Sequence, residues 1–198
     1  MEREKVYLFN GKNMEGWKTR WSKETPNWKV EEDGTVTVGD EDIISEYEFG
    51  DAHLHVEFRT PYMPDHHGQA RGNSGVYVQA AYEVQVLDSY GIEDPQNNDC
   101  SGLYEMHKPL CNACLPPMEW QTYDIILRAP RFNQYGEVSE NGRMTVIQNG
   151  IVVHNNVELP HVTPGDIFEG KRPARGPLML QDHGNPVSFR NVWVMPLD

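Results

Sequence analysis

The sequence predicts an all-β fold, built as an antiparallel β-sandwich. Short apolar or alternating runs recur roughly every ten residues, with turn residues between them, as in sandwich domains. The Asp33-Gly34 pair and the Asn149-Gly150 pair each separate two such runs, which is the pattern of a tight β-hairpin. No window shows a long apolar repeat with the helical period of 3.6 residues.

We expect residues 1–198 to form one domain. A chain of 198 residues is long enough for one sizeable core, and all-β domains of about 200 residues are commonly single units. Hydrophobic residues make up 38% of the chain and aromatic residues 10%, which is typical of a globular protein. The 17 glycines and 14 prolines are scattered along the chain at predicted turns, and the sequence shows no domain linker, internal repeat or low-complexity tract.

The charge and hydropathy of the chain exclude several classes of partner. The net charge is −13, from 30 acidic and 17 basic residues, so a nucleic acid or an anionic membrane surface would be repelled. No apolar stretch approaches the roughly 20 residues of a membrane span. A small neutral or cationic ligand remains compatible with this charge.

Three predicted strands, at residues 53–59, 82–88 and 178–183, carry unusual polar side chains on one face. Successive strand side chains alternate between faces, and parity assigns to the polar faces His53, His55, Glu57, Arg59, Glu83, Gln85, Met179, Gln181 and His183. Each face taken alone favours an ordinary solvated surface. Together they are rich in the Arg, His, Gln and Glu side chains that bind hydroxyls and carbonyls, so neighbouring strands would form a groove suited to a sugar.

Two long predicted loops carry further aromatic and polar residues that could contribute to the groove. They cover residues 61–73 and 89–118, and loops of this length in a compact domain are usually functional or disordered. We favour function, because the loops carry side chains such as Tyr62, Arg71 and Tyr104. Each aromatic residue alone is more often part of a core.

We predict no metal site and no cofactor. Cys111 and Cys114 have CxxC spacing, but only Cys100 and His107 lie near them, so zinc is disfavoured. A disulfide within this loop and three free thiols both remain open. The acidic loop at residues 93–99 offers oxygen ligands for calcium, yet its spacing matches no defined calcium loop, and a solvated turn is favoured.

Several segments resemble, in order, the family of 3-keto-disaccharide hydrolases, long known only as a domain of unknown function. The match extends over essentially the whole chain, and its pieces are specific in combination and weak singly. The matching segments are Leu8-Phe9-Asn10-Gly11-Lys12-Asn13, Gly16-Trp17, Asn73-Ser74-Gly75-Val76-Tyr77, Tyr82-Glu83-Val84-Gln85-Val86-Leu87-Asp88, Gly102-Leu103-Tyr104, Glu119-Trp120-Gln121-Thr122-Tyr123-Asp124-Ile125, Gln148-Asn149-Gly150, Leu180-Gln181-Asp182-His183-Gly184 and Val187-Ser188-Phe189-Arg190-Asn191-Val192.

The resemblance implies a jelly-roll sandwich of concanavalin A type that acts on glycosides whose C3 hydroxyl has been oxidised to a ketone. Many relatives are exported, which favours a periplasmic or extracellular location. The charged N-terminus, residues 1–5, has no apolar signal core, so a cytoplasmic location stays open as well. The Cys111–Cys114 segment is not part of the family pattern.

A ketone at C3 acidifies the C2 proton, and its removal gives an enolate that expels the aglycone from C1 before water adds. Such a site needs a base near C2, hydrogen-bond donors at the ketone oxygen and an acid near the leaving group. Glu83 and Asp88 are the candidate bases. His183 and His107 are the candidate proton shuttles.

Arg59 and Gln181 are the candidate donors to the developing enolate oxygen. The plainer alternative for Arg59 is a cross-strand ion pair with Glu83. The candidate substrate-binding residues are Gln85, Gln181, Asn73, Tyr77, Tyr104 and Trp120.

Two other functions remain open from the sequence. Some retaining glucanases of this fold carry an E-x-D-x-x-E strand, and this chain has Glu83, Gln85 and Asp88 at the same spacing. The shorter Asp88 makes the required carboxyl separation of about 5–5.5 Å doubtful. A non-catalytic sugar-binding module is the second alternative, because a fold does not dictate a function.

Overall fold

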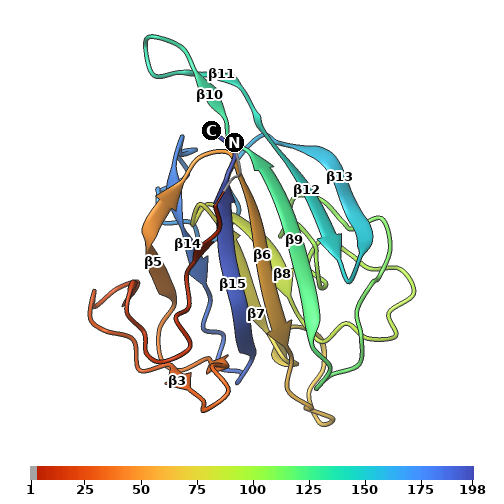
Figure 1. The fold of residues 1–198 in the computed structure, drawn as a ribbon. Coiled ribbons are helices and arrows are strands. Elements are labelled where there is room, and N and C mark those ends of the chain that lie inside the picture. Colours follow the sequence, from red (N-terminus) through yellow and green to blue (C-terminus); the bar gives the residue numbers. More distant parts are fainter. Residues whose placement is uncertain (1–3) are drawn as a thin grey trace.

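The computed structural model describes residues 4–198, so the first three residues of the charged N-terminal segment lie outside the described part. It confirms the predicted all-β antiparallel sandwich (Figure 1). One 3-10 turn interrupts the strands, at Gly68–Ala70. The strands are β1 (Val6–Tyr7), β2 (Trp17–Thr19), β3 (Lys29–Val30), β4 (Val36–Thr37), β5 (Ile43–Phe49), β6 (Ala52–Arg59), β7 (Ser74–Val78), β8 (Tyr82–Val86), β9 (Gln121–Arg128), β10 (Arg131–Phe132), β11 (Val138–Glu140), β12 (Gly142–Gln148), β13 (Ile151–Leu159), β14 (Gly176–Leu180) and β15 (Ser188–Pro196).

Two large sheets form the sandwich. The larger sheet has the order β13-β12-β9-β6-β15-β4-β3, with β1 also paired to β15. The smaller sheet has the order β2-β5-β14-β7-β8. The short β10-β11 hairpin forms a sheet of its own and projects from one end of the molecule (Figure 1).

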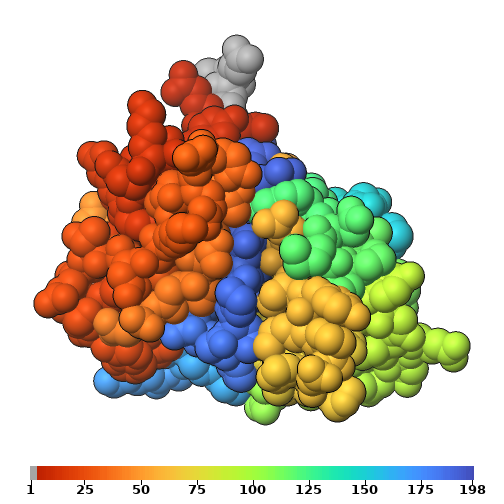
Figure 2. All heavy atoms as spheres, turned by 90° about the horizontal axis from the view of Figure 1, so that it is seen from below, coloured from red at the N-terminus to blue at the C-terminus, as the bar shows by residue number. Residues whose placement is uncertain are grey.

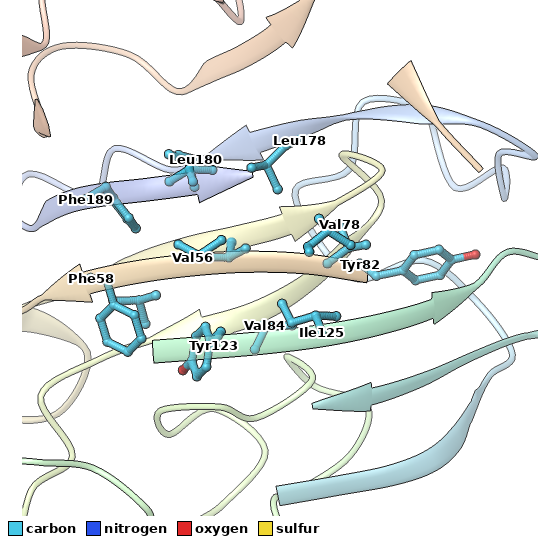
Figure 3. Close-up of a cluster of buried hydrophobic side chains, with 14 of the residues drawn as sticks. Val56, Phe58, Val78, Tyr82, Val84, Tyr123, Ile125, Leu178, Leu180 and Phe189 are labelled. Carbon is cyan, nitrogen blue, oxygen red and sulfur yellow. The ribbon is translucent and has the colours of Figure 1, made fainter. Parts of the chain in front are cut away.

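The core lies between the two sheets because side chains alternate along each strand. On β6, Leu54, Val56 and Phe58 are fully buried and alternate with half-buried polar residues. Figure 3 shows Val56 and Phe58 of the larger sheet beside Val84 and Leu180 of the smaller one. Burying a side chain such as Phe58 contributes about 1.5–3 kcal/mol, so this alternation drives the pairing of the sheets.

The smaller sheet is covered on its other face as well. Strands β7, β8 and β14 are buried along their whole length. The segment at residues 160–175 crosses this outer face, where Thr163 N donates to Ala81 O at 2.9 Å and Ile167 N donates to Ala80 O at 3.1 Å. This cover contributes to the burial of β7, β8 and β14 on the outer face of the smaller sheet.

The two predicted hairpins are confirmed. Strands β3 and β4 pair as antiparallel neighbours around Asp33-Gly34, and β12 and β13 pair around Asn149-Gly150. Asn149 has φ of 52° and Gly150 has φ of 80°, the positive values that a tight hairpin turn requires. In the described residues, no helix is long and apolar enough to cross a membrane.

Candidate functional site

A pocket of about 190 Å³ lies on the outer face of the smaller sheet, where β7, β8 and β14 meet. The register places Tyr77 opposite Glu83 and Gly75 opposite Gln85. Just beyond β14, Gln181 N donates to Gly75 O at 3.0 Å, which brings Gln181 beside the same strands. The lining residues are Gln69, Asn73, Tyr77, Glu83, Gln85, Tyr104, Pro164, Gly165, Gln181 and His183.

Glu83 is the carboxylic acid of this pocket and is 2% exposed. Its Oε2 accepts a hydrogen bond of 2.8 Å from the Tyr77 hydroxyl, and no cation in residues 4–198 forms an ion pair with it. Burial raises the pKa of Glu83 to about 8, because burial penalises its charged form. The hydrogen bond from Tyr77 lowers that pKa in part, whereas the carboxylates of Asp42 and Glu105 raise it.

Two glycines make room for these groups. A Cβ at Gly75 would lie 2.5 Å from Glu83 Oε1 and 2.9 Å from the Tyr77 ring. A Cβ at Gly165 would lie 2.6 Å from the Tyr77 hydroxyl oxygen, and Gly165 has φ of +84°, which favours glycine. The Tyr77–Glu83 pair therefore depends on the absence of side chains on two separate segments.

Four amide side chains line the same pocket as the carboxyl group. Gln85 Nε2 donates to Gln69 Oε1 at 3.0 Å, and Asn73 Nδ2 donates to the Gln69 backbone oxygen at 2.7 Å. The amide oxygens of Asn73, Gln85 and Gln181 have no hydrogen-bond partner in the described part of the chain. A buried polar atom without a partner costs about 1–3 kcal/mol, and the hydroxyls of a sugar would supply donors.

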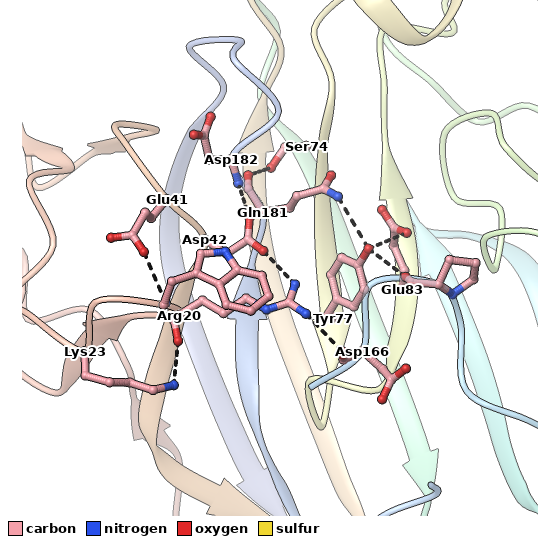
Figure 4. A network of polar contacts seen from close by, with 12 residues as sticks. Arg20, Lys23, Glu41, Asp42, Ser74, Tyr77, Glu83, Asp166, Gln181 and Asp182 are labelled. Atoms are coloured by element: carbon pink, nitrogen blue, oxygen red, sulfur yellow. Dashed lines mark hydrogen bonds and ion pairs between the residues drawn. The ribbon is translucent and has the colours of Figure 1, made fainter. Parts of the chain in front are cut away.

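A polar network holds the β14 side of the pocket in place (Figure 4). Asp42 binds Arg20 at 3.0 Å and accepts a hydrogen bond of 2.9 Å from Asp182 N. The Ser74 hydroxyl donates to the Gln181 backbone oxygen at 2.7 Å. The backbone on both sides of the Gln181 side chain is thereby fixed, which orients its amide toward Tyr77, with Nε2 at 3.4 Å from the hydroxyl.

The long loop at residues 89–118 adds Tyr104 to the pocket. Tyr104 N donates to the Glu83 backbone oxygen at 3.1 Å, which continues the edge of β8. Burial raises the pKa of the Tyr104 hydroxyl, as do the nearby Glu105 and Glu83 carboxylates. Tyr104 is therefore a neutral hydrogen-bonding wall at neutral pH.

The structure brings together most of the residues expected to line one surface. Glu83, Gln85, Gln181 and His183 meet in this pocket, as strand parity predicts. The predicted binding residues Asn73, Tyr77 and Tyr104 line it too.

The prediction that Arg59 and Trp120 belong to the same groove is wrong. Arg59 ends β6, which pairs with β9 and β15 in the larger sheet, whereas Glu83 lies in the smaller sheet. The guanidinium of Arg59 lies 4.8 Å from the centre of the Trp120 ring, and Arg190 lies 4.0 Å from it. The alternative ion pair between Arg59 and Glu83 is excluded for the same reason. Parity fixes the side of a strand but does not decide which sheet the strand joins.

Asp88 and His107 also lie outside the pocket. Asp88 follows the end of β8, where its carboxylate binds Arg71 at 3.2 Å and lines a different cavity. His107 Nε2 forms a hydrogen bond of 2.8 Å with the Glu158 backbone oxygen. Both residues are displaced from Glu83 by loop conformations that alternation along β8 does not describe.

Sequence reasoning did not assign Gln69, Pro164 and Gly165 to the site. Gln69 lies in the 3-10 turn of the loop at residues 61–73, which its length and polar composition had already marked. Pro164 and Gly165 belong to the segment that covers the smaller sheet. Their Pro-Gly pair is a turn signal, but nothing in the sequence says where that turn lies.

The cysteines contribute no ligand set. All three are free thiols, so the disulfide within the CxxC loop is not formed. Cys100 is buried with its Sγ 3.2 Å from the Tyr123 hydroxyl, and Gln148 Nε2 lies 3.5 Å from both Cys100 Sγ and Cys114 Sγ. In residues 4–198, no group of three or more His, Cys, Asp or Glu side chains is arranged to hold a metal ion.

Comparisons with solved structures agree with this architecture. A protein of Parabacteroides distasonis, provisionally assigned as a glycosyl hydrolase, is 37% identical with a TM-score of 0.88, over 98% of this chain and 84% of that one. A second such protein from the same organism is 22% identical with a TM-score of 0.69, over 98% and 94% of the two chains. The carbohydrate-binding module CBM66 of Bacillus subtilis is 13% identical with a TM-score of 0.51, over 89% and 93%, and shows the fold alone.

No curated protein sequence matches the chain. The family model of the 3-keto-alpha-glucoside-1,2-lyase-like domain matches residues 4–195. That match supports a carbohydrate-active function and includes every residue of the pocket. The chain therefore belongs to the family of 3-keto-alpha-glucoside-1,2-lyase-like domains, the 3-keto-disaccharide hydrolases.

Proposed function

We propose that this protein cleaves 3-keto glycosides by elimination of the aglycone next to the C3 ketone, followed by hydration. The observation that carries the proposal is the buried Glu83, which has a pKa of about 8. It lies in a pocket otherwise lined mainly by amides, hydroxyls and one histidine. A general base works best when its pKa is near the working pH, because it is then both available and strongly basic. The family match supports the same chemistry.

The proposed steps assign one role to each group. The Glu83 carboxylate takes the proton from C2, and the electron pair of that C–H bond forms an enolate with the C3 oxygen. The Gln181 amide N–H donates a hydrogen bond to that oxygen, as an oxyanion-hole donor does. The enolate then reforms the ketone and breaks the C1–O bond, leaving a C1=C2 double bond. His183 supplies the proton for the departing alcohol.

Water completes the reaction by adding across the double bond. Its oxygen bonds to C1 and its released proton returns to His183, while C2 recovers a proton from Glu83, so the products are the 3-keto sugar and the free alcohol. Glu83 returns to its carboxylate form, and no oxidant or reductant is consumed. The unpartnered amide oxygens of Asn73 and Gln85 accept hydrogen bonds from the other sugar hydroxyls.

The pocket disfavours a retaining glycosidase. That mechanism needs two carboxyl groups about 5–5.5 Å apart across the scissile bond. Among residues 4–198, Glu83 is the only carboxylic acid that lines the pocket, and Asp88 belongs to a separate cavity. A purely sugar-binding module has no need of an acid held at a raised pKa.

The test is a matched pair of substrates, a methyl glucoside and its 3-keto derivative. We expect cleavage of the keto compound alone, because the ketone supplies an acidity that positioned proton transfer, worth about 10²–10⁴-fold, cannot replace. Glu83→Gln should abolish cleavage while the variant stays folded. Cleavage of the unoxidised glucoside at a comparable rate would refute the mechanism. Absence of cleavage of both would leave a binding module.

A further inference from the structure

A second cavity, here called the tyrosine cleft, lies beside the loop that also contributes to the Glu83 pocket. It encloses about 200 Å³ at the end of the sandwich, where the loops at residues 61–73 and 89–118 meet. Figure 2 shows these two loops, gold and yellow-green to green, packed together on that end of the molecule. The lining residues are Tyr62, Met63, Pro64, Arg71, Asp88, Tyr90 and Pro117, and none of them lines the Glu83 pocket.

Two exposed tyrosines supply the apolar part of the cleft. Tyr62 is 68% exposed and Tyr90 is 54% exposed, so neither ring is part of the hydrophobic core. The prolines at positions 64 and 117 add rigid apolar surface. Aromatic rings with a polar hydroxyl end are typical of surfaces that bind ligands with one apolar and one polar side.

A charged pair supplies the polar part. Arg71 donates through Nε and Nη2 to the Asp88 backbone oxygen, at 3.2 and 2.8 Å, and its Nε lies 3.2 Å from Asp88 Oδ2. Asp88 is 7% exposed, and its Oδ1 accepts only a long bond of 3.3 Å from Tyr90 N. Arg71 Nη1 makes no hydrogen bond in the described chain. One donor and one acceptor are thus fixed side by side, and each has capacity left.

We propose that the tyrosine cleft binds one neutral sugar ring and is a second carbohydrate site, separate from the Glu83 pocket. The C–H face of a pyranose packs on Tyr62 and Tyr90, and two adjacent hydroxyls bind Arg71 Nη1 and Asp88 Oδ1. The opposite charges of Arg71 and Asp88 balance, and the net charge of −13 disfavours an anionic sugar. The inference rests on the carbohydrate-active character of the family and not on the 3-keto chemistry.

The geometry places the two sites on either side of one loop. Gln69 and Asn73 line the Glu83 pocket, and Arg71, between them, lines the tyrosine cleft. Asn73 N is held by Asn185 Oδ1 at 2.8 Å, and Asp88 N donates to Arg71 O at 3.2 Å. A glycan held in the cleft therefore stays near the pocket, and this raises the effective concentration of its other ends there.

The test uses Glu83→Gln, which prevents turnover, as the parent protein. Calorimetric titrations with maltotriose, cellotriose and laminaritriose measure binding to the parent, to Tyr62→Ala/Tyr90→Ala in that background, and to Tyr135→Ala as the matched control. Tyr135 is an exposed tyrosine outside both cavities. We expect at least one trisaccharide to bind, with affinity reduced about 10-fold or more by the double substitution and unchanged by the control.

Two results would overturn the inference: no binding of any of the three trisaccharides, or binding that the double substitution leaves intact. The substituted tyrosines are exposed, so both variants should keep the melting temperature of the parent within a few degrees. The proposed function is tested separately, by measuring cleavage of methyl 3-keto-glucoside by the wild-type protein. If none of the trisaccharides binds the parent but the wild type cleaves the 3-keto glucoside, only the inference about the cleft is refuted. If a trisaccharide binds as expected but the wild type does not cleave the 3-keto glucoside, only the proposed reaction is refuted.

Discussion

Replacing Tyr77 by Phe tests whether Glu83 is the base. The Tyr77 hydroxyl donates a 2.8 Å hydrogen bond to Glu83 and thereby lowers the pKa of a carboxyl group that burial has raised to about 8. A hydrogen bond to a charged group is worth about 1.5–3 kcal/mol. At 1.36 kcal/mol per pKa unit, its loss should raise the pKa of Glu83 by roughly 1–2 units further.

The sign of the effect follows from the protonation state that the reaction needs. The base must be ionised, so kcat/KM in the wild-type protein should rise with pH, bend near pH 8 and level off above it. In Tyr77→Phe the bend should move to about pH 9–10, which lowers the rate at pH 8 by about 5- to 50-fold. The high-pH plateau should be reduced far less than the rate at pH 8.

The assay is kcat/KM for a 3-keto glucoside between pH 5.5 and 10, with the uncatalysed rate subtracted at each pH. Tyr104→Phe is the matched control, because Tyr104 lines the same pocket but its hydroxyl makes no hydrogen bond to the Glu83 carboxyl group in the described residues, and its bend should stay near pH 8. A bend that stays in place or moves to lower pH in Tyr77→Phe would show that Glu83 is not the group that titrates.

Four further predictions use other observations. Glu83 is more easily protonated in the folded chain, with a pKa of about 8 against the ordinary 4.5, so this group costs stability as pH rises from 4.5 to 8. The melting temperature of Glu83→Gln should therefore increase relative to that of the wild type as the pH rises through this range, and the underlying gain in the free energy of unfolding is at most about 5 kcal/mol. A difference in melting temperature that stays constant with pH would contradict the raised pKa. Gly75→Ala should cut keto turnover on the order of 10²-fold by displacing the carboxyl group, and normal turnover would show that the Gly75 contact is unimportant. A thiol reagent should label the exposed Cys111 in the folded protein and the buried Cys100 only after unfolding; early labelling of Cys100, mapped by peptide digestion, would refute this burial. Arg59→Ala should leave kcat/KM within about twofold, and a tenfold loss would place Arg59 in the reaction after all.

The part of the site that sequence could predict follows from local geometry. Glu83 and Gln85 are two residues apart on one strand, so they must share a face whatever the rest of the chain does. Gln181 and His183 are also two residues apart and both line the pocket, although they lie just past the end of β14.

What sequence could not provide was the pairing of distant strands and the paths of loops. Arg59 has the same parity as a pocket residue, but hydrogen bonding of β6 to β9 and β15 places it in the other sheet. Glu83 N donates to the Thr163 hydroxyl, 80 residues away in sequence, and the neighbouring Pro164 and Gly165 line the pocket in which burial raises the pKa of Glu83. Both facts depend on long-range contacts that no local pattern encodes.

The position of β15 has a consequence for how the chain reaches its native state. This last strand pairs with β6 on one side and with β4 and β1 on the other, so it completes the middle of the larger sheet and not its edge. Until residues 188–196 have left the ribosome, β6 exposes an open edge and a row of apolar side chains. We therefore expect folding of the larger sheet to wait for these residues and to be slow, in the millisecond-to-second range of sandwiches with distant pairings. Chains that stop before β15 should aggregate.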